Sequence, residues 1–222
     1  MGDSKISANL KSIYQKLLAC HGPQHWWPGE KPFEVMVGAV LTQSAAWSNV
    51  EKAIGNLKAA GKMSAAALRD IPLEDLAKLI YPSGYYNAKA KKLKALVEWL
   101  GKYGDELSRL GDLETNDLRR ELLNVHGIGP ETADSILLYS IDRPAFVIDA
   151  YTRRLFARLG FKPQKDTYDG WRALFMDNLP SDVKLFNEYH ALIVRHGKEQ
   201  CRKTPQCREC CLNTGCEGSS SR

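Results

Sequence analysis

The residues most able to do chemistry are a Gly-Ile-Gly turn at 127–129 and a lone carboxylate, Asp149, that follows one helix later. Glycine adopts positive φ and lets a phosphate approach the main chain closely. Pro130 suits the first position of the next helix, whose N–H groups and dipole favour an anion. The turn without a ligand is the alternative, but the apolar helix after it favours DNA chemistry, with phosphate contacts from Gly127, Ile128, Gly129 and Thr132.

Tryptophans form a second candidate group. Trp26 and Trp27 are adjacent before Pro28, and Trp47 lies at a later helix joint. A base turned out of a duplex needs aromatic faces that replace its lost stacking. Indole faces also favour a cationic base, whose own charge already weakens its glycosidic bond. The alternative for these side chains is packing in the protein interior.

Five of the six cysteines crowd the end of the chain. Cys201, Cys207, Cys210 and Cys216 have the spacing C-x5-C-x2-C-x5-C, which predicts a [4Fe–4S] cluster. Zinc is the competing interpretation, although structural zinc usually uses two short cysteine pairs. Cys211 is expected to lie beside the ligands, and Cys20 to be a buried core thiol. His190 and His196, just before the cluster, are expected to be structural.

Composition narrows the class of protein. The 222 residues carry a formal charge of +5, which permits nucleic-acid binding without demonstrating it. No apolar run reaches the length of a membrane span, and the N-terminus lacks a signal pattern. We therefore expect a cytoplasmic monomer, associated with the nucleoid if the source is prokaryotic.

The elements that position these groups are helices, because apolar residues recur at spacings of three and four. The run 146–148 resembles a strand but has no partner, so the fold class is all-α. Lys89, Lys91, Lys92 and Lys94 are expected to form a mostly solvated face. The expected helices are 5–20, 33–45, 47–60, 64–69, 73–80, 87–103, 115–124, 130–141, 150–159, 168–178 and 182–197.

Leu-x-x-Val-x-Gly-Ile-Gly-x-x-Thr-Ala, the later Asp149 and the terminal cysteines together resemble the endonuclease III superfamily of DNA glycosylases. The resemblance implies a two-lobed helix-hairpin-helix fold with a C-terminal cluster loop, and a lesion in double-stranded DNA that enters between the lobes. One lobe is expected at 25–143, and the other at 1–24 and 144–222. The resemblance makes Asp149 the catalytic carboxylate, a role compatible with capping the next helix.

Trp-Trp-Pro, Leu-Thr-Gln-x-x-x-Trp and Pro-Ser-Gly-Tyr-Tyr-Asn-x-Lys-Ala resemble the 3-methyladenine branch of this superfamily. That likeness places Trp26, Trp27 and Trp47 in the base pocket. It also gives Gln43 or Ser44 the role of filling the gap left by the base. Bifunctional members carry a nucleophilic lysine where this chain has Glu131, so we expect hydrolysis by water without strand cleavage. Glu131 is expected either near the sugar or as a simple first-turn acid.

Two other functions stay open at this stage. A glycosylase for mismatched or oxidised bases would carry the same hairpin and carboxylate. A non-catalytic DNA-binding module would keep the hairpin and the cluster, although the retained Asp149 argues against it. Release of free base from defined duplexes separates these alternatives.

Overall fold

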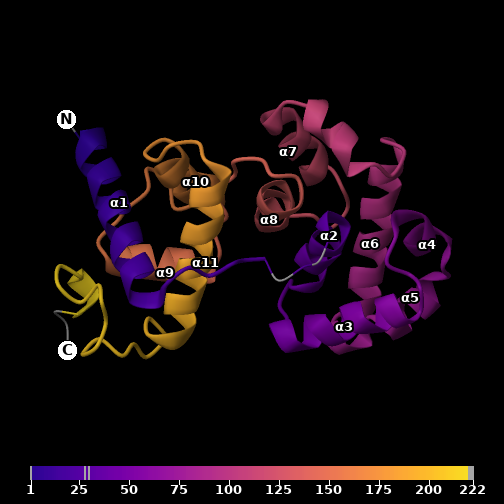
Figure 1. Cartoon of the computed structure of the whole chain (residues 1–222), viewed down its shortest axis with the longest axis horizontal. Coiled ribbons are helices and arrows are strands. Elements are labelled where there is room, and N and C mark those ends of the chain that lie inside the picture. Colours follow the sequence, from indigo (N-terminus) through magenta and orange to yellow (C-terminus); the bar gives the residue numbers. More distant parts are fainter. Residues whose placement is uncertain (1, 28, 30, 220–222) are drawn as a thin grey trace. The chain divides into compact units, whose positions relative to one another are not determined.

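The computed structural model describes residues 2–27, 29 and 31–219. Helices are the regular elements throughout these residues, and no strand occurs among them, as predicted (Figure 1). The chain divides into two compact units, one of residues 27–143 and one of residues 1–26 with 144–222. We call them the hairpin unit and the terminal unit. No helix in the described part of the chain has the length and apolar character that crossing a membrane requires.

The hairpin unit is built around α2 (Pro32–Leu41), whose residues 34–41 are all buried. Pro32 starts the helix, and Glu34, a buried acid in its first turn, forms an ion pair with Lys58, with Nζ and Oε2 2.8 Å apart. Helix α2 packs against α8, where Ser140 Oγ donates to the Pro32 carbonyl at 2.7 Å. The other elements of this unit are α3 (Trp47–Ala59), α4 (Ala65–Asp70), α5 (Leu73–Leu79), η1 (Tyr81–Ser83), α6 (Tyr86–Gly101), η2 (Leu107–Asp112), α7 (Thr115–Leu123) and α8 (Pro130–Ser140).

Helices α7 and α8 are joined by a buried ion pair. Arg119 Nε donates to Asp134 Oδ1 at 2.8 Å, and Nη2 donates to Oδ2 at 3.2 Å. The Asp134 side chain is fully buried, and Arg119 is 14% exposed. A two-point guanidinium–carboxylate contact fixes orientation as well as distance. This pair therefore sets the angle at which the turn between the two helices is presented.

The terminal unit has an aromatic core. The Phe146 ring stacks on Phe175 with centroids 4.0 Å apart, and Tyr189 donates its hydroxyl to the Leu10 carbonyl at 2.8 Å. Residues 145–148 are buried and belong to no strand, as the sequence indicated. The helices of this unit are α1 (Gly2–His21), α9 (Ala150–Arg158), α10 (Tyr168–Met176) and α11 (Val183–Glu199), followed by the turn η3 (Glu217–Ser219).

Candidate functional site

The predicted turn between α7 and α8 has the geometry that its glycines require. Gly127 has φ +78°, and a Cβ there would collide with the Lys92 side chain. Gly129 is the N-cap of α8, without any side-chain cap, and a Cβ there would meet only open space. The first N–H groups of a helix have no intrahelical acceptor and favour an anion. The turn therefore has room for a phosphate at its exposed glycine.

The other two residues expected at the phosphate have buried side chains. Ile128 is 4% exposed and Thr132 is 6% exposed. The Thr132 hydroxyl accepts a hydrogen bond from Gln43 Nε2 at 2.9 Å. Any contact that these residues make to DNA must therefore come from the backbone.

Gln43, a candidate for the gap left by a flipped base, is bonded to the hairpin instead of pointing away from it. Its Nε2 donates to the Gly127 carbonyl at 3.2 Å as well as to Thr132, and its Oε1 accepts from Lys92 Nζ at 2.5 Å. The neighbouring Ser44 is exposed and has φ +52°. Gln43 thus braces the loop before α3 against the turn.

The lysine run on α6 is not a solvated face, and that expectation was wrong. Lys89 is 1% exposed and donates to the carbonyls of Leu41 and Ser83 at 2.8 and 2.6 Å. Burial, with a smaller contribution from Lys92, lowers the pKa of Lys89 to about 8. Lys94 donates to backbone carbonyls at Arg69 and Ile71. The ammonium groups of Lys89 and Lys94 thus donate hydrogen bonds to backbone carbonyls inside the protein. Only Lys91 of the run is exposed.

The tryptophans fall in different units. Trp27 contacts Trp47 edge to face, with centroids 5.4 Å apart, and Tyr139 at 5.1 Å. Trp26 belongs to the terminal unit, where Lys198 Nζ lies 5.9 Å from its ring centroid. Tyr139 was not singled out in the sequence, because an aromatic in the apolar helix α8 has the pattern of an ordinary core residue.

Asp149 is the N-cap of α9, the structural role foreseen for it. Its Oδ1 accepts from the Thr152 amide at 2.7 Å and from the Thr152 hydroxyl at 2.9 Å. Its Oδ2 lies 3.6 Å from His190 Nε2 on α11. The Asp149 side chain is 13% exposed, so the carboxylate is held from two sides but keeps access to its surroundings.

Two opposing effects set the ionisation of this carboxylate. Burial by itself raises the pKa of Asp149, whereas His190 and the two donors of Thr152 lower it. The lowering effects prevail, and the net pKa lies below the usual value of an aspartate. Asp149 is therefore ionised at neutral pH. His190, expected to be only structural, is the residue that sequence reasoning missed at this site.

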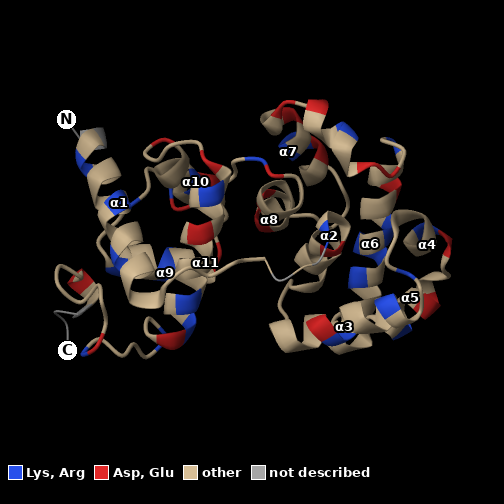
Figure 2. Cartoon of the chain, viewed as in Figure 1, with Lys and Arg blue, Asp and Glu red and all other residues tan. Residues whose placement is uncertain are grey.

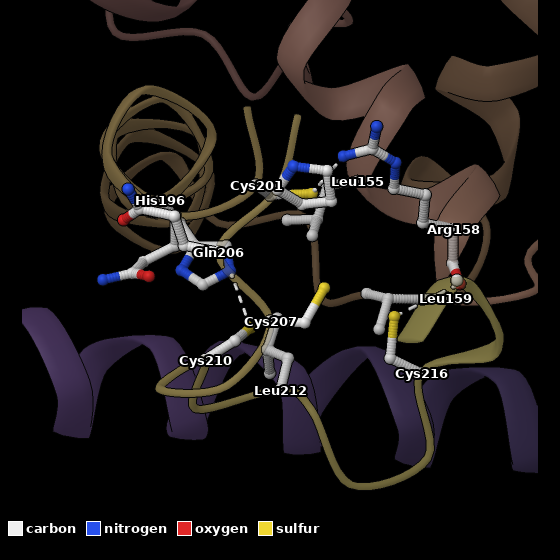
Figure 3. Close-up of a pocket in the computed structure, with 13 residues that line it drawn as sticks. Leu155, Arg158, Leu159, His196, Cys201, Gln206, Cys207, Cys210, Leu212 and Cys216 are labelled. Carbon is white, nitrogen blue, oxygen red and sulfur yellow. Dashed lines mark hydrogen bonds between the residues drawn. The ribbon is translucent and has the colours of Figure 1, made fainter. Parts of the chain in front are cut away.

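All four cysteines predicted as cluster ligands line one cavity in the terminal unit (Figure 3). The cavity is small, about 20 Å³ in volume, and Leu155, Leu159 and Leu212 form its apolar wall. Arg158 Nη1 donates to Cys201 Sγ at 3.3 Å, and His196 Nε2 lies 3.5 Å from Cys210 Sγ. Burial and the nearby His21 lower the pKa of His196 to about 4, so this imidazole is neutral at pH 7.

This donor set fits an iron–sulfur cluster. Four thiols converge from one loop, and an arginine N–H points at one sulfur. Cluster sulfurs carry negative charge and are tuned by such donors. No disulfide occurs among the six cysteines. Cys211 does not line the cavity, as expected for a non-ligand, and Cys20 is exposed, which corrects the prediction of a buried core thiol.

Charge is mixed on several helices, whereas a few carry mainly one sign. Basic and acidic residues occur together on α3, α5 and α11 (Figure 2). By contrast, α9 holds three arginines and no acid, and α6 holds four lysines and one glutamate. The positive excess of the sequence is therefore partly gathered on α6 and α9.

Comparison with known proteins agrees with the hairpin and the all-helical fold. The pattern of the HhH-GPD superfamily of base excision DNA repair proteins matches residues 37–181. A protein of Methanocaldococcus jannaschii, whose name marks it as a provisional DNA repair glycosylase, is 46% identical over 219 residues, covering 97% of this chain and 99% of that protein.

Two solved structures share the fold. The 3-methyladenine DNA glycosylase of H. pylori, bound to 1,N6-ethenoadenine, has a TM-score of 0.73 at 29% identity, over 90% of this chain and 98% of its own. A trapped covalent complex of endonuclease III with DNA has a TM-score of 0.83 at 24% identity, over 97% and 98%.

The fold and the hairpin thus define a DNA repair protein of the helix-hairpin-helix class. The chain belongs to the HhH-GPD superfamily, the group that includes endonuclease III. It is a DNA glycosylase of base excision repair, and DNA is its binding partner.

Proposed function

We propose that this glycosylase is monofunctional and removes alkylated bases of the 3-methyladenine type, leaving an abasic site. The observation that carries the substrate class is the aromatic cluster of Trp27, Trp47 and Tyr139. Electron-rich rings stack on a flipped base and favour one that carries positive charge. Trp26 is assigned to the same base pocket on the resemblance alone. The 3-methyladenine DNA glycosylase among the structural relatives supports this choice.

Asp149 is assigned to the sugar. Hydrolysis of a glycosidic bond passes through a sugar with oxocarbenium character. A fixed carboxylate stabilises that developing charge and orients the attacking water, because it needs no rearrangement during the reaction. The bonds from Thr152 hold Oδ1 in place, and the lowered pKa keeps the group ionised. A base that leaves as a neutral molecule from a cationic nucleotide needs no strong general acid.

Glu131 determines the absence of strand cleavage. It is exposed on the first turn of α8, where bifunctional relatives place an amine. A carboxylate cannot form a Schiff base with the sugar, so the covalent route is closed. Water is then the nucleophile. We assign Glu131 to a position near the sugar; the alternative for it is a first-turn acid that only favours the helix dipole.

DNA is held at the turn of the hairpin. Backbone N–H groups at Gly127–Gly129 and at the start of α8 bind a phosphate of the damaged strand, with Thr132 contributing through its amide. Ser44, exposed beside the brace formed by Gln43, fills the space left by the base.

Cys201, Cys207, Cys210 and Cys216 hold a [4Fe–4S] cluster, whose chemistry here is to tie the C-terminal loop into one folded unit. Arg158 donates a hydrogen bond to the sulfur of Cys201 and also donates to the carbonyls of Arg202 and Lys203. The cluster residues thus order a basic loop after α11.

Base release tests the proposal directly. The protein is incubated with duplexes that contain methylated purines, uracil, a thymine mismatch or an oxidised purine, and free bases are separated by chromatography. Release from the methylated duplex alone supports the proposal, and preferential release from another duplex overturns the substrate class. Borohydride is added in parallel, with endonuclease III as the positive control. A covalent protein–DNA complex formed by this chain would contradict the role given to Glu131.

A further inference from the structure

A second group of metal-binding side chains lies outside the cavity of the four cluster cysteines. Cys20 and His21 end helix α1, and Cys211 follows the cluster ligand Cys210. The ligand atoms of these three residues all lie within 4.8 Å of one another. The ligand atoms of one tetrahedral ion lie closer together than this. Slight adjustment of the rotamers of these three side chains would bring their ligand atoms to that separation. Residues far apart in the sequence thus present two thiols and an imidazole to one point.

The hydrogen bonds of His21 determine which nitrogen can bind a metal. Its Nε2 lies 3.0 Å from His196 Nδ1, so we assign the ligand role to Nδ1. The Nδ1 atom lies 3.8 Å from Glu199 Oε2. Metal-binding histidines usually donate their other N–H to an acceptor, which fixes the ring. His196 is placed to be that acceptor.

We propose that Cys20, His21 and Cys211 bind one zinc ion, separate from the [4Fe–4S] cluster, with the fourth position open toward Glu199. Two thiolates and an imidazole form a ligand set that binds zinc in preference to magnesium or calcium, which favour oxygen ligands. Three protein ligands with one open position are also a known zinc arrangement. The ion joins the end of α1 to the loop that carries the four cysteines of the cluster cavity.

The arrangement also explains the position of Cys211. It does not line the cluster cavity, it is half-buried, and its sulfur lies within 4.8 Å of that of Cys20. With zinc on Nδ1, His21 carries its hydrogen on Nε2 and donates to His196. His196 in turn places an N–H toward Cys210 Sγ, at 3.5 Å. A continuous chain of hydrogen bonds then runs from the zinc site to a cluster ligand.

Metal content of the full chain tests this site. Wild type, Cys20→Ser and Cys211→Ser are purified without oxygen, equilibrated with chelator-buffered zinc and desalted, and iron and zinc are counted by mass spectrometry. We expect both variants to hold one zinc fewer per chain than wild type, with iron unchanged at about four per chain. Cys20 is exposed, so its substitution leaves the core intact.

Cys207→Ser is the control for the cluster, because it should lose iron, whereas Cys20→Ser should keep it. Equal zinc in wild type and Cys20→Ser would overturn the proposal. So would a fall of iron in Cys211→Ser, which would make Cys211 a cluster ligand. Loss of two hydrogens with a Cys20–Cys211 crosslink in the intact wild type would show a disulfide instead. None of these outcomes depends on glycosylase activity.

Discussion

Replacing Asp149 by asparagine removes the charge of the candidate catalytic group and keeps its shape. Asparagine caps helices about as well as aspartate, and its Oδ1 can still accept from Thr152. The fold should therefore lose no more than about 1 kcal/mol of stability. Any large loss of activity must then come from chemistry, which makes this variant a cleaner test than alanine.

The size of the effect follows from electrostatics. A unit charge about 4 Å from a cationic sugar contributes roughly 4 kcal/mol at an effective dielectric constant of about 20. His190 offsets part of that field, and the 13% exposure of the Asp149 side chain screens another part. We expect base release to slow by about a hundredfold to a thousandfold, since each ~1.4 kcal/mol is a factor of about ten.

Single-turnover release of 3-methyladenine from alkylated duplex is the appropriate assay, because it isolates the chemical step from product release. Thermal unfolding of both proteins is measured beside it. A variant that folds normally and releases base within about threefold of the wild-type rate, less than ~1 kcal/mol in the barrier, would refute the assignment of Asp149.

Three further changes probe what surrounds these groups. In His190→Gln, the pKa of Asp149 loses the lowering effect of His190 and rises, so the acid limb of the pH–rate profile should move to higher pH. In wild type, the stabilisation from ionised Asp149 is present above the usual aspartate pKa and is lost as pH falls through the lowered value. Arg119→Met removes the guanidinium that pairs with the buried Asp134 carboxylate and should lower the free energy of unfolding by about 3–5 kcal/mol in a denaturant titration. Gly127→Ala should lose about 1–2 kcal/mol from its positive φ alone and weaken duplex binding in a fluorescence anisotropy titration.

Matched variants separate the proposed causes from general damage. An unchanged acid limb in His190→Gln would show that His190 does not act on the carboxylate. Adding Asp134→Leu to Arg119→Met should restore much of the lost stability, because the uncompensated charge is gone. Gly55→Ala, in an open and exposed position of α3, should be neutral or stabilising. Equal effects at Gly55 and Gly127 would contradict the argument from the turn.

The helices and the hairpin were predictable because their signals are local. Apolar spacing, Pro130 at a helix start and glycines at the turn each act within a few residues. The same holds for Asp149, whose capping partner Thr152 is three residues away. The four cysteines predicted as cluster ligands were grouped by their spacing alone, and they line one cavity.

The residues that were missed or misjudged depend on tertiary contacts. His190 reaches Asp149 from another helix, and nothing near it in the sequence indicates a carboxylate partner. Lys89 looks like part of an exposed basic run until two backbone carbonyls surround it. Cys20 has the spacing of a core residue on α1 but ends in an exposed position near Cys211. A single sequence records none of these distances.

Gln43 and Ser44 were the two candidates for one role, filling the gap left by the base, and their contacts in the structure differ. The amide of Gln43 already bonds to Gly127, Thr132 and Lys92, so entering a duplex would break these three contacts, two of them to the hairpin. Ser44 makes the sharper turn, because φ +52° in a residue with a Cβ is unfavourable by about 1–2 kcal/mol. Such strain persists only where neighbouring contacts fix the backbone, and the brace at Gln43 supplies them. The loop therefore presents Ser44 because Gln43 is held back, which is why we propose the serine for the gap-filling role.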